Sequence, residues 1–137
     1  MPDEVAWTEG VRSELLRAVA ACRPRELVAV LGGRCAGRAA SVTAFVEVPN
    51  VAPADDSFAV EPAAFAAAER SLRRAGCAFV GFVHSHPNGS AAPSERDRAE
   101  LWPCCLQLIA AGGDLRAYWL DEARVLHPLP GRVAEAV

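Results

Sequence analysis

The chain contains no lysine, because all fourteen basic residues are arginines. The sequence also has seventeen acidic residues. The protein therefore offers no internal lysine for isopeptide attachment. The formal net charge is -3 and the sequence has no basic run, so the electrostatic footprint of nucleic-acid binding is missing. We expect no nucleic-acid partner.

Long apolar runs are also missing, although 52% of the residues are hydrophobic. No segment approaches the roughly 20 apolar residues that span a bilayer. The first residues, Met1 to Glu4, are acidic and lack the basic and apolar regions of a secretory signal. A chain of 137 residues suffices for one domain with a core. We predict a single cytoplasmic domain over 1–137, with no membrane partner.

The five cysteines form neither a CxxC pair nor a disulfide framework. Three of them, Cys77, Cys104 and Cys105, lie in apolar segments of strand-like composition, where cysteine usually packs as a small hydrophobic residue. We assign the cysteines to packing. An alternative is that a cysteine acts as a thiol nucleophile paired with His127, although no spacing in the sequence supports that pairing.

Hydrophobic periodicity and turn residues predict the order of the elements. Helices are expected over 10–22 and 62–75, with Gly76 as the cap, and strands over 26–31, 39–48, 77–83, 104–111, 115–121 and 123–127. Turns are expected over 32–37 and 112–114, a loop over 49–56, a short extended piece over 58–60 and a frayed tail over 128–137. The pattern indicates an α/β fold in which helices flank a mixed β-sheet.

Histidine is scarce, yet two of the three histidines are two residues apart in His84-Ser85-His86-Pro87. Alternate residues of a strand face the same side, so both imidazoles can reach one ion. A helix that begins at Pro93-Ser94 places Ser94 and Asp97 on one face. The side chains on that face can then point toward the end of the strand that carries the histidines.

Two imidazoles and a carboxylate form a ligand set typical of catalytic zinc, which keeps its fourth position for water. His84, His86 and Asp97 are the candidate ligands. The segment from Ser94 to Asp97 also fits a capping box, in which the serine and the acidic residue bond each other's backbone amide. Taken alone, the capping box explains this segment as well. The four polar residues together favour metal binding.

The spacing His84-x-His86-Pro87 followed by Ser94-x-x-Asp97 resembles the signature of the JAB1/MPN/Mov34 metalloenzymes, also called JAMM-type peptidases. The family pattern also has an upstream Pro-x-Glu before an apolar strand, which is similar to Pro24-Arg25-Glu26 here. Ala29 stands where the family often has glycine, a residue that binds no metal. The resemblance implies a cytidine deaminase-like α/β architecture.

The resemblance also implies roles for these residues. His84, His86 and Asp97 would hold Zn²⁺, Glu26 would accept and pass on the proton of the attacking water, and Ser94 would donate a hydrogen bond to the oxyanion. The implied activity is that of a peptidase or isopeptidase. It would hydrolyse the amide bond after the C-terminal Gly-Gly of a ubiquitin-like or sulfur-carrier protein of the β-grasp type.

Two other functions were weighed. A non-catalytic MPN-like scaffold would bind partners only, but such members typically lose ligands that this chain keeps. A nucleobase or nucleoside deaminase has His-x-Glu and a later Pro-Cys-x-x-Cys. Here His84 is followed by His86, and Pro103-Cys104-Cys105 lacks the second spacing.

Overall fold

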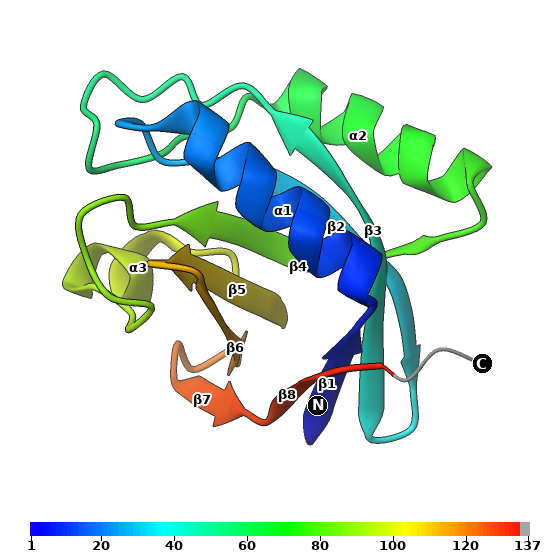
Figure 1. Ribbon diagram of the computed structural model, residues 1–137. Helices are drawn as coiled ribbons and strands as arrows, with labels where there is room; N and C mark the ends of the chain where they lie inside the picture. The colour runs from blue at the N-terminus through cyan, green and yellow to red at the C-terminus, as the bar shows by residue number, and fades with distance from the viewer. Residues whose placement is uncertain (135–137) are drawn as a thin grey trace.

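The part of the chain that the structure describes forms one curled, mixed β-sheet of eight strands with helices on both faces (Figure 1). The computed structural model describes residues 1–134. The strands are β1 (Glu4–Trp7), β2 (Val28–Ala36), β3 (Ala39–Val48), β4 (Ala78–Ser85), β5 (Cys105–Ala111), β6 (Asp114–Leu120), β7 (Leu126–Leu129) and β8 (Gly131–Val133). The helices are α1 (Glu9–Cys22), α2 (Pro62–Arg74) and α3 (Glu95–Glu100).

The helices begin and end where local chemistry dictates. The Thr8 hydroxyl caps α1 by accepting a hydrogen bond of 3.1 Å from the amide of Val11. Pro62 occupies the first turn of α2, where its missing N–H costs nothing. After α2 the chain turns at Gly76, whose φ of +83° is the left-handed conformation that glycine adopts freely.

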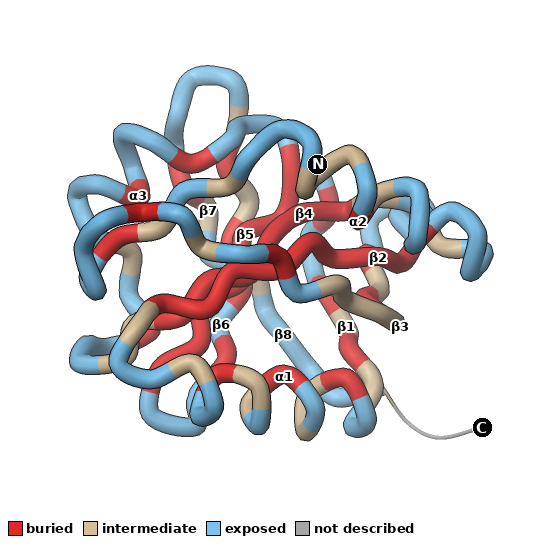
Figure 2. The backbone as a smooth tube through the Cα atoms, turned by 90° about the horizontal axis from the view of Figure 1, so that it is seen from above, coloured by how far each residue is buried: buried red, intermediate tan, exposed pale blue. Residues whose placement is uncertain are grey.

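The strand order β7-β6-β5-β4-β2-β3-β1-β8 places β7 and β8 at opposite ends of the sheet. Only Pro130 lies between these two strands in the sequence, so the sheet must curl until its two edges meet. Figure 1 shows β7, β8 and β1 together at the lower side of the molecule. This closure leaves β4 and β5 in the middle, where Figure 2 shows nearly continuous burial.

Each face of the sheet has its own core. The apolar side of α1, including Leu15, packs with the larger cluster around Leu31 and Leu108. On the other face, Leu72 of α2 packs against Val30 and Phe82. The central strands are therefore apolar on both sides, as sequence runs such as 27–31 indicate. Such a sandwich holds the ends of β2 and β4 rigidly.

Several boundaries differ from those that the sequence predicts. β2 continues through the expected turn at 32–37, because Gly32 to Ala36 pair with β3 up to a tight hairpin. The last long strand begins at Leu126 rather than at 123, because Arg124 lies in a turn at a φ of +66°. The short extended piece expected over 58–60 belongs to none of the described strands. Strand β1 was not predicted.

Part of the C-terminal segment that the sequence predicts to fray forms strands. Pro128 and Leu129 belong to β7, and Gly131–Val133 form β8, which pairs in parallel with β1. The last part of the expected tail, 135–137, lies outside the described residues. A three-residue strand carries almost no signal of its own, because its position depends on a partner strand more than a hundred residues away.

All five cysteines are free. Cys105 is buried in β5, as expected for a packing residue. The assignment is wrong for Cys35 and Cys104, which are both exposed, and Cys104 lies before the strand with a φ of +63°. None of the described helices has the length and apolar character of a membrane-crossing segment.

Candidate metal centre

Strand pairing brings the upstream glutamate to the histidines. β2 and β4 are antiparallel, with Val28 opposite His84. Two steps further along the same register, Glu26 comes to lie opposite His86. Opposed residues of an antiparallel pair, and alternate residues of each strand, share one face of the sheet. The side chains of Glu26, His84 and His86 therefore converge, although 58 residues separate the first two.

Four potential donor atoms, the Nε2 atoms of His84 and His86 and the Oδ1 and Oδ2 atoms of Asp97, lie close together. The Nε2 atoms of His84 and His86 are 3.1 Å apart, and each is 3.1 Å from a carboxylate oxygen of Asp97. In a tetrahedral zinc site with bonds of about 2.0 to 2.1 Å, ligand atoms are about 3.3 to 3.4 Å apart. Two imidazole nitrogens and a carboxylate at this spacing fit a zinc ion after small adjustments.

The environment of each ring differs. The Nδ1 atom of His86 lies 2.8 Å from the carbonyl oxygen of Ser90, so Nδ1–H donates to it, and a neutral, metal-binding His86 would carry its lone pair on Nε2. The ring of His84 is fully buried and stacks on Phe58 at 4.7 Å between centroids. Among the described residues, its Nδ1 has no hydrogen-bond partner.

Asp97 belongs to a capping box and faces the imidazoles at the same time. Its amide donates to the Ser94 hydroxyl at 3.0 Å, and its Oδ2 accepts from the Ser94 amide at 2.9 Å. The same Oδ2 lies 3.1 Å from Nε2 of His86. The capping box and the metal interpretation are therefore compatible, because the cap fixes the carboxylate rotamer against the histidines.

Burial and hydrogen bonding shift the pKa values of the three groups in different directions. Burial lowers the pKa of His84, whereas the bond to Asp97 raises the pKa of His86. Burial alone would raise the pKa of Asp97, but the bonds from both histidines outweigh it and hold this pKa well below its usual value. Asp97 is thus an anion that two imidazoles can face.

Glu26 lies at the same centre under different conditions. One carboxylate oxygen and the ligand nitrogens of His84 and His86 all lie within 4.8 Å of one another. The glutamate is only 5% exposed, and burial raises its pKa to about 7. Glu26 could complete a Glu-His-His metal site, or it could exchange a proton near neutral pH.

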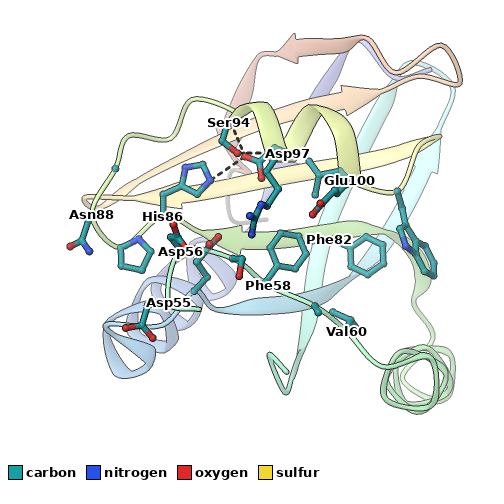
Figure 3. Close-up of a pocket in the computed structure, with 18 of the residues that line it drawn as sticks. Asp55, Asp56, Phe58, Val60, Phe82, His86, Asn88, Ser94, Asp97 and Glu100 are labelled. Carbon is teal, nitrogen blue, oxygen red and sulfur yellow. Dashed lines mark hydrogen bonds and ion pairs between the residues drawn. The ribbon is translucent and has the colours of Figure 1, made fainter. Parts of the chain in front are cut away.

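The Ser94 hydroxyl accepts from the Asp97 amide, which leaves its own hydrogen able to donate. Ser94 also lines an open cavity of about 450 Å³ beside the histidines. Figure 3 shows His86, Ser94 and Asp97 along one side of this cavity, with Phe58 and Phe82 across from them. The structure thus gathers all five predicted site residues at one place, with His84 behind Phe58.

One wall of the cavity is the segment 55–60, which Asn50 holds in place. The Asn50 amide nitrogen donates to the carbonyl oxygens of Glu26 and Ser57 at 2.9 and 3.0 Å, and its oxygen accepts from the amides of Ala52 and Ala59 at 3.0 and 3.1 Å. All four hydrogen-bonding positions of this side chain are used.

Sequence reasoning assigned no role to Asn50 or to Ser85. Ser85 is fully buried, and its hydroxyl accepts a 2.7 Å bond from the amide of Leu27, the residue after Glu26. Its position inside the His-x-His pair was the only available signal. Asn50 follows Pro49 in a segment expected as a loop, and loop polarity alone does not reveal four bonds, one of which reaches Glu26 in a distant segment.

Comparison with known proteins gives a consistent family. The family model described as prokaryotic homologues of the JAB domain matches residues 8–121. A probable TtuB-protein conjugate cleaving protease of Thermus thermophilus is 32% identical over 118 residues, covering 85% of this chain and 73% of the relative. A desampylase of Haloferax volcanii is 32% identical over 123 residues, covering 86% and 87%.

Solved structures agree on the fold. A solution structure of a protein from Desulfitobacterium hafniense matches with a TM-score of 0.86 and 22% identity, over 97% of this chain and 94% of that one. The crystal structure of a JAB1/MPN domain protein from Archaeoglobus fulgidus matches with a TM-score of 0.61 and 20% identity, over 95% and 99%. The expected α/β architecture is confirmed.

Proposed function

This chain belongs to the family of prokaryotic homologues of the JAB domain, and from this premise we propose that it is a zinc-dependent protease. Its substrate would be the amide bond after the C-terminal Gly-Gly of a ubiquitin-like or sulfur-carrier protein. The observation that carries the proposal is the convergence of two imidazole nitrogens 3.1 Å apart, each 3.1 Å from a different oxygen of Asp97, beside a protonatable glutamate.

His84, His86 and Asp97 would hold the ion, and Glu26 would stay outside the ligand set. The two carboxylates differ in what they favour: Asp97 is kept anionic by two imidazoles, whereas burial gives Glu26 a pKa of about 7. A bound Zn²⁺ supplies Lewis acidity, which lowers the pKa of water and polarises a carbonyl group.

Glu26 would act first as the general base and then as the general acid. A base whose pKa lies near neutrality can accept a proton from water and give it to the leaving amine within one cycle. The Glu26 carboxylate lies within 4.8 Å of the histidine nitrogens, so a water molecule fits between these groups.

Ser94 and the cavity would hold the substrate. The free hydroxyl hydrogen of Ser94 would donate to the carbonyl oxygen as negative charge develops there, and one such donor is worth about 100- to 1,000-fold in rate. The relative from Thermus thermophilus is named for cleaving TtuB-protein conjugates, which supports a protein conjugate as the substrate class.

The alternatives have less support. A scaffold that only binds partners has no use for a carboxylate of raised pKa beside two histidines. A deaminase of this fold needs a glutamate two residues after its first histidine, where this chain has His86. Stoichiometric zinc and chelator-sensitive activity in the purified protein separate the protease from the scaffold.

The substrate is tested by incubating zinc-loaded protein with a panel of Gly-Gly-terminated carriers. Each carrier is joined either to an amino acid or peptide by its α-amine or to a lysine side chain, and intact mass reports the products. We expect cleavage after the second glycine in at least one class. Zinc-loaded protein that cleaves no conjugate would refute the substrate assignment.

Glu26→Gln tests the proton role. Glutamine has nearly the same size but cannot accept the proton, so we expect kcat to fall by at least about 1,000-fold. The zinc content, measured by mass spectrometry under native conditions, should stay at one ion per chain. Loss of zinc in this variant would instead make Glu26 a ligand, and retained turnover would remove it from the mechanism.

A further inference from the structure

The serine between the two histidines connects both halves of the site. Ser85 is fully buried at the end of β4. Its amide donates to the carbonyl oxygen of Leu27 at 3.0 Å, and its hydroxyl accepts from the amide of Leu27 at 2.7 Å. One residue of the histidine segment thus binds both backbone groups of the residue that follows Glu26.

This pairing departs from a regular antiparallel ladder. In a regular pair, two opposed residues exchange two bonds between backbone groups. Here the second bond of Leu27 goes to the Ser85 side chain, so a hydroxyl takes the place of a carbonyl. The spacing between the two strands at this point therefore depends on a side chain that a point mutation can remove.

The replacement of a carbonyl group by the Ser85 hydroxyl matters because of the residues in the next opposed pair of the two strands. In the continued register Glu26 is opposite His86, and the two side chains share a face. On the other side of β4, the amide of His86 donates to Ala110 of β5 at 2.9 Å, which anchors the histidine segment. The bond from the Leu27 amide to the Ser85 hydroxyl then sets the position of Glu26 relative to the histidines, which the bond to β5 holds in place.

We propose that Ser85 is a positioning residue, whose hydroxyl sets the distance between the Glu26 carboxylate and the histidine pair. The inference rests on the proposed function, because it assumes that Glu26 acts on water beside those histidines. Ser85 touches neither the substrate nor the ion. Its effect passes through the backbone of Leu27, which Asn50 also constrains by bonding the Glu26 carbonyl oxygen.

Ser85→Ala is the decisive variant, since alanine is smaller and fits the same space. We expect kcat to fall by about 10- to 100-fold, because a displacement of about 1 Å can cost 100-fold in rate. KM and the zinc affinity should stay within about threefold, because neither the cavity wall nor a ligand is removed. Ser85→Thr restores the hydroxyl and should recover most of kcat.

A second readout does not depend on activity. In the zinc-free protein, the Leu27 amide should exchange with solvent hydrogen at least about tenfold faster in Ser85→Ala, relative to the ladder amides of β2. Thr8→Ala is the matched control, since it also removes a hydroxyl that accepts from a backbone amide, at the remote start of α1. That control should leave kcat and the exchange of Leu27 relative to β2 unchanged.

The possible outcomes distinguish the positioning role of Ser85 from the proposed protease function on which it rests. Wild-type protein that cleaves no conjugate would refute the proposed function. Active wild-type protein with an equally active Ser85→Ala variant would refute only the positioning role. A fall in kcat that follows a parallel loss of zinc would also refute it, because Ser85 would then act on the ligands.

Discussion

Two histidine–aspartate pairs on this chain have similar contacts and different surroundings. At the sheet centre, His84 and His86 lie 3.1 Å from Asp97, and these side chains are 0%, 15% and 6% exposed. At the rim, His127 lies 2.8 Å from Asp121, with side chains 38% and 31% exposed. The shorter contact belongs to the pair without a predicted function.

The difference shows that a short contact does not define a site. The bond from His127 also lowers the pKa of Asp121, so the direction of the shift is the same in both pairs. What the rim pair lacks is a third donor and shielding from water. Asp121 faces one imidazole, whereas Asp97 faces two, beside a buried glutamate and an open cavity.

The largest expected effect comes from Asp97→Asn. Asparagine keeps an oxygen that can accept from the Ser94 amide, so the capping box and the fold should survive. It lacks the negative charge that a divalent ion requires. Lewis-acid activation is worth several kcal/mol, so we expect kcat/KM to fall by at least about 1,000-fold, with loss of bound zinc. Zinc content and conjugate cleavage are measured on folded protein.

An Asp97→Asn protein that keeps its zinc and its activity would make Glu26 the third ligand, as the 4.8 Å grouping of Glu26, His84 and His86 allows. The Asp97 carboxylate, which both histidines contact, would then have only a capping role. Combining Asp97→Asn with Glu26→Gln would show which of the two carboxylates retains the ion.

A smaller effect is expected from Asn50→Ala, which loosens the wall that shields the central pair. Four hydrogen bonds are lost, and we expect about 1 to 3 kcal/mol of stability to go with them. KM should rise by about tenfold because Phe58 and its neighbours lose their fixed position, while zinc stays bound. Denaturant unfolding and steady-state kinetics measure both effects.

Asn50→Asp keeps the two accepting bonds and removes the donating ones, so its KM should lie between those of wild type and Asn50→Ala. An unchanged KM in both variants would mean that the segment 55–60 does not contact the substrate. The shielding that separates the two histidine–aspartate pairs would then arise from burial by the sheet alone.

The four polar residues of the central site were predictable from sequence because their signal is local. His84, His86, Ser94 and Asp97 lie within fourteen residues, and strand and helix periodicity are enough to turn them toward each other. Glu26 was selected by resemblance to the family, because several glutamates precede the histidines. Pairing of β2 with β4 supplies the physical reason for its place.

The remaining features depend on contacts between distant segments. The closing strands β1 and β8 pair with each other across almost the whole chain, and neither has enough residues for a periodic pattern. Asn50 and Ser85 act on backbone groups, which carry no mark in the sequence. The composition of Cys104-Cys105 suggested two buried residues, yet only Cys105 enters the strand.

The smallest effect is expected from Asp121→Asn, the matched change in the rim pair. Asparagine keeps an oxygen for the amide of Val125, which bonds Oδ1 at 2.9 Å, and its NH₂ group can still donate to His127. Zinc content and kcat/KM should equal those of wild type. Solvent screens this pair, so we expect the midpoint of thermal unfolding, Tm, to change by less than about 2 °C near neutral pH.

The pH dependence gives this small effect a sign. The folded-state pKa of Asp121 is lowered, so any stability from its charge is present above the ordinary Asp pKa of about 3.9 and is lost as the pH falls through the folded value. The Tm of wild type and Asp121→Asn should therefore converge under acid conditions. A large loss of activity at neutral pH would contradict the comparison, because it would make the exposed pair part of the site.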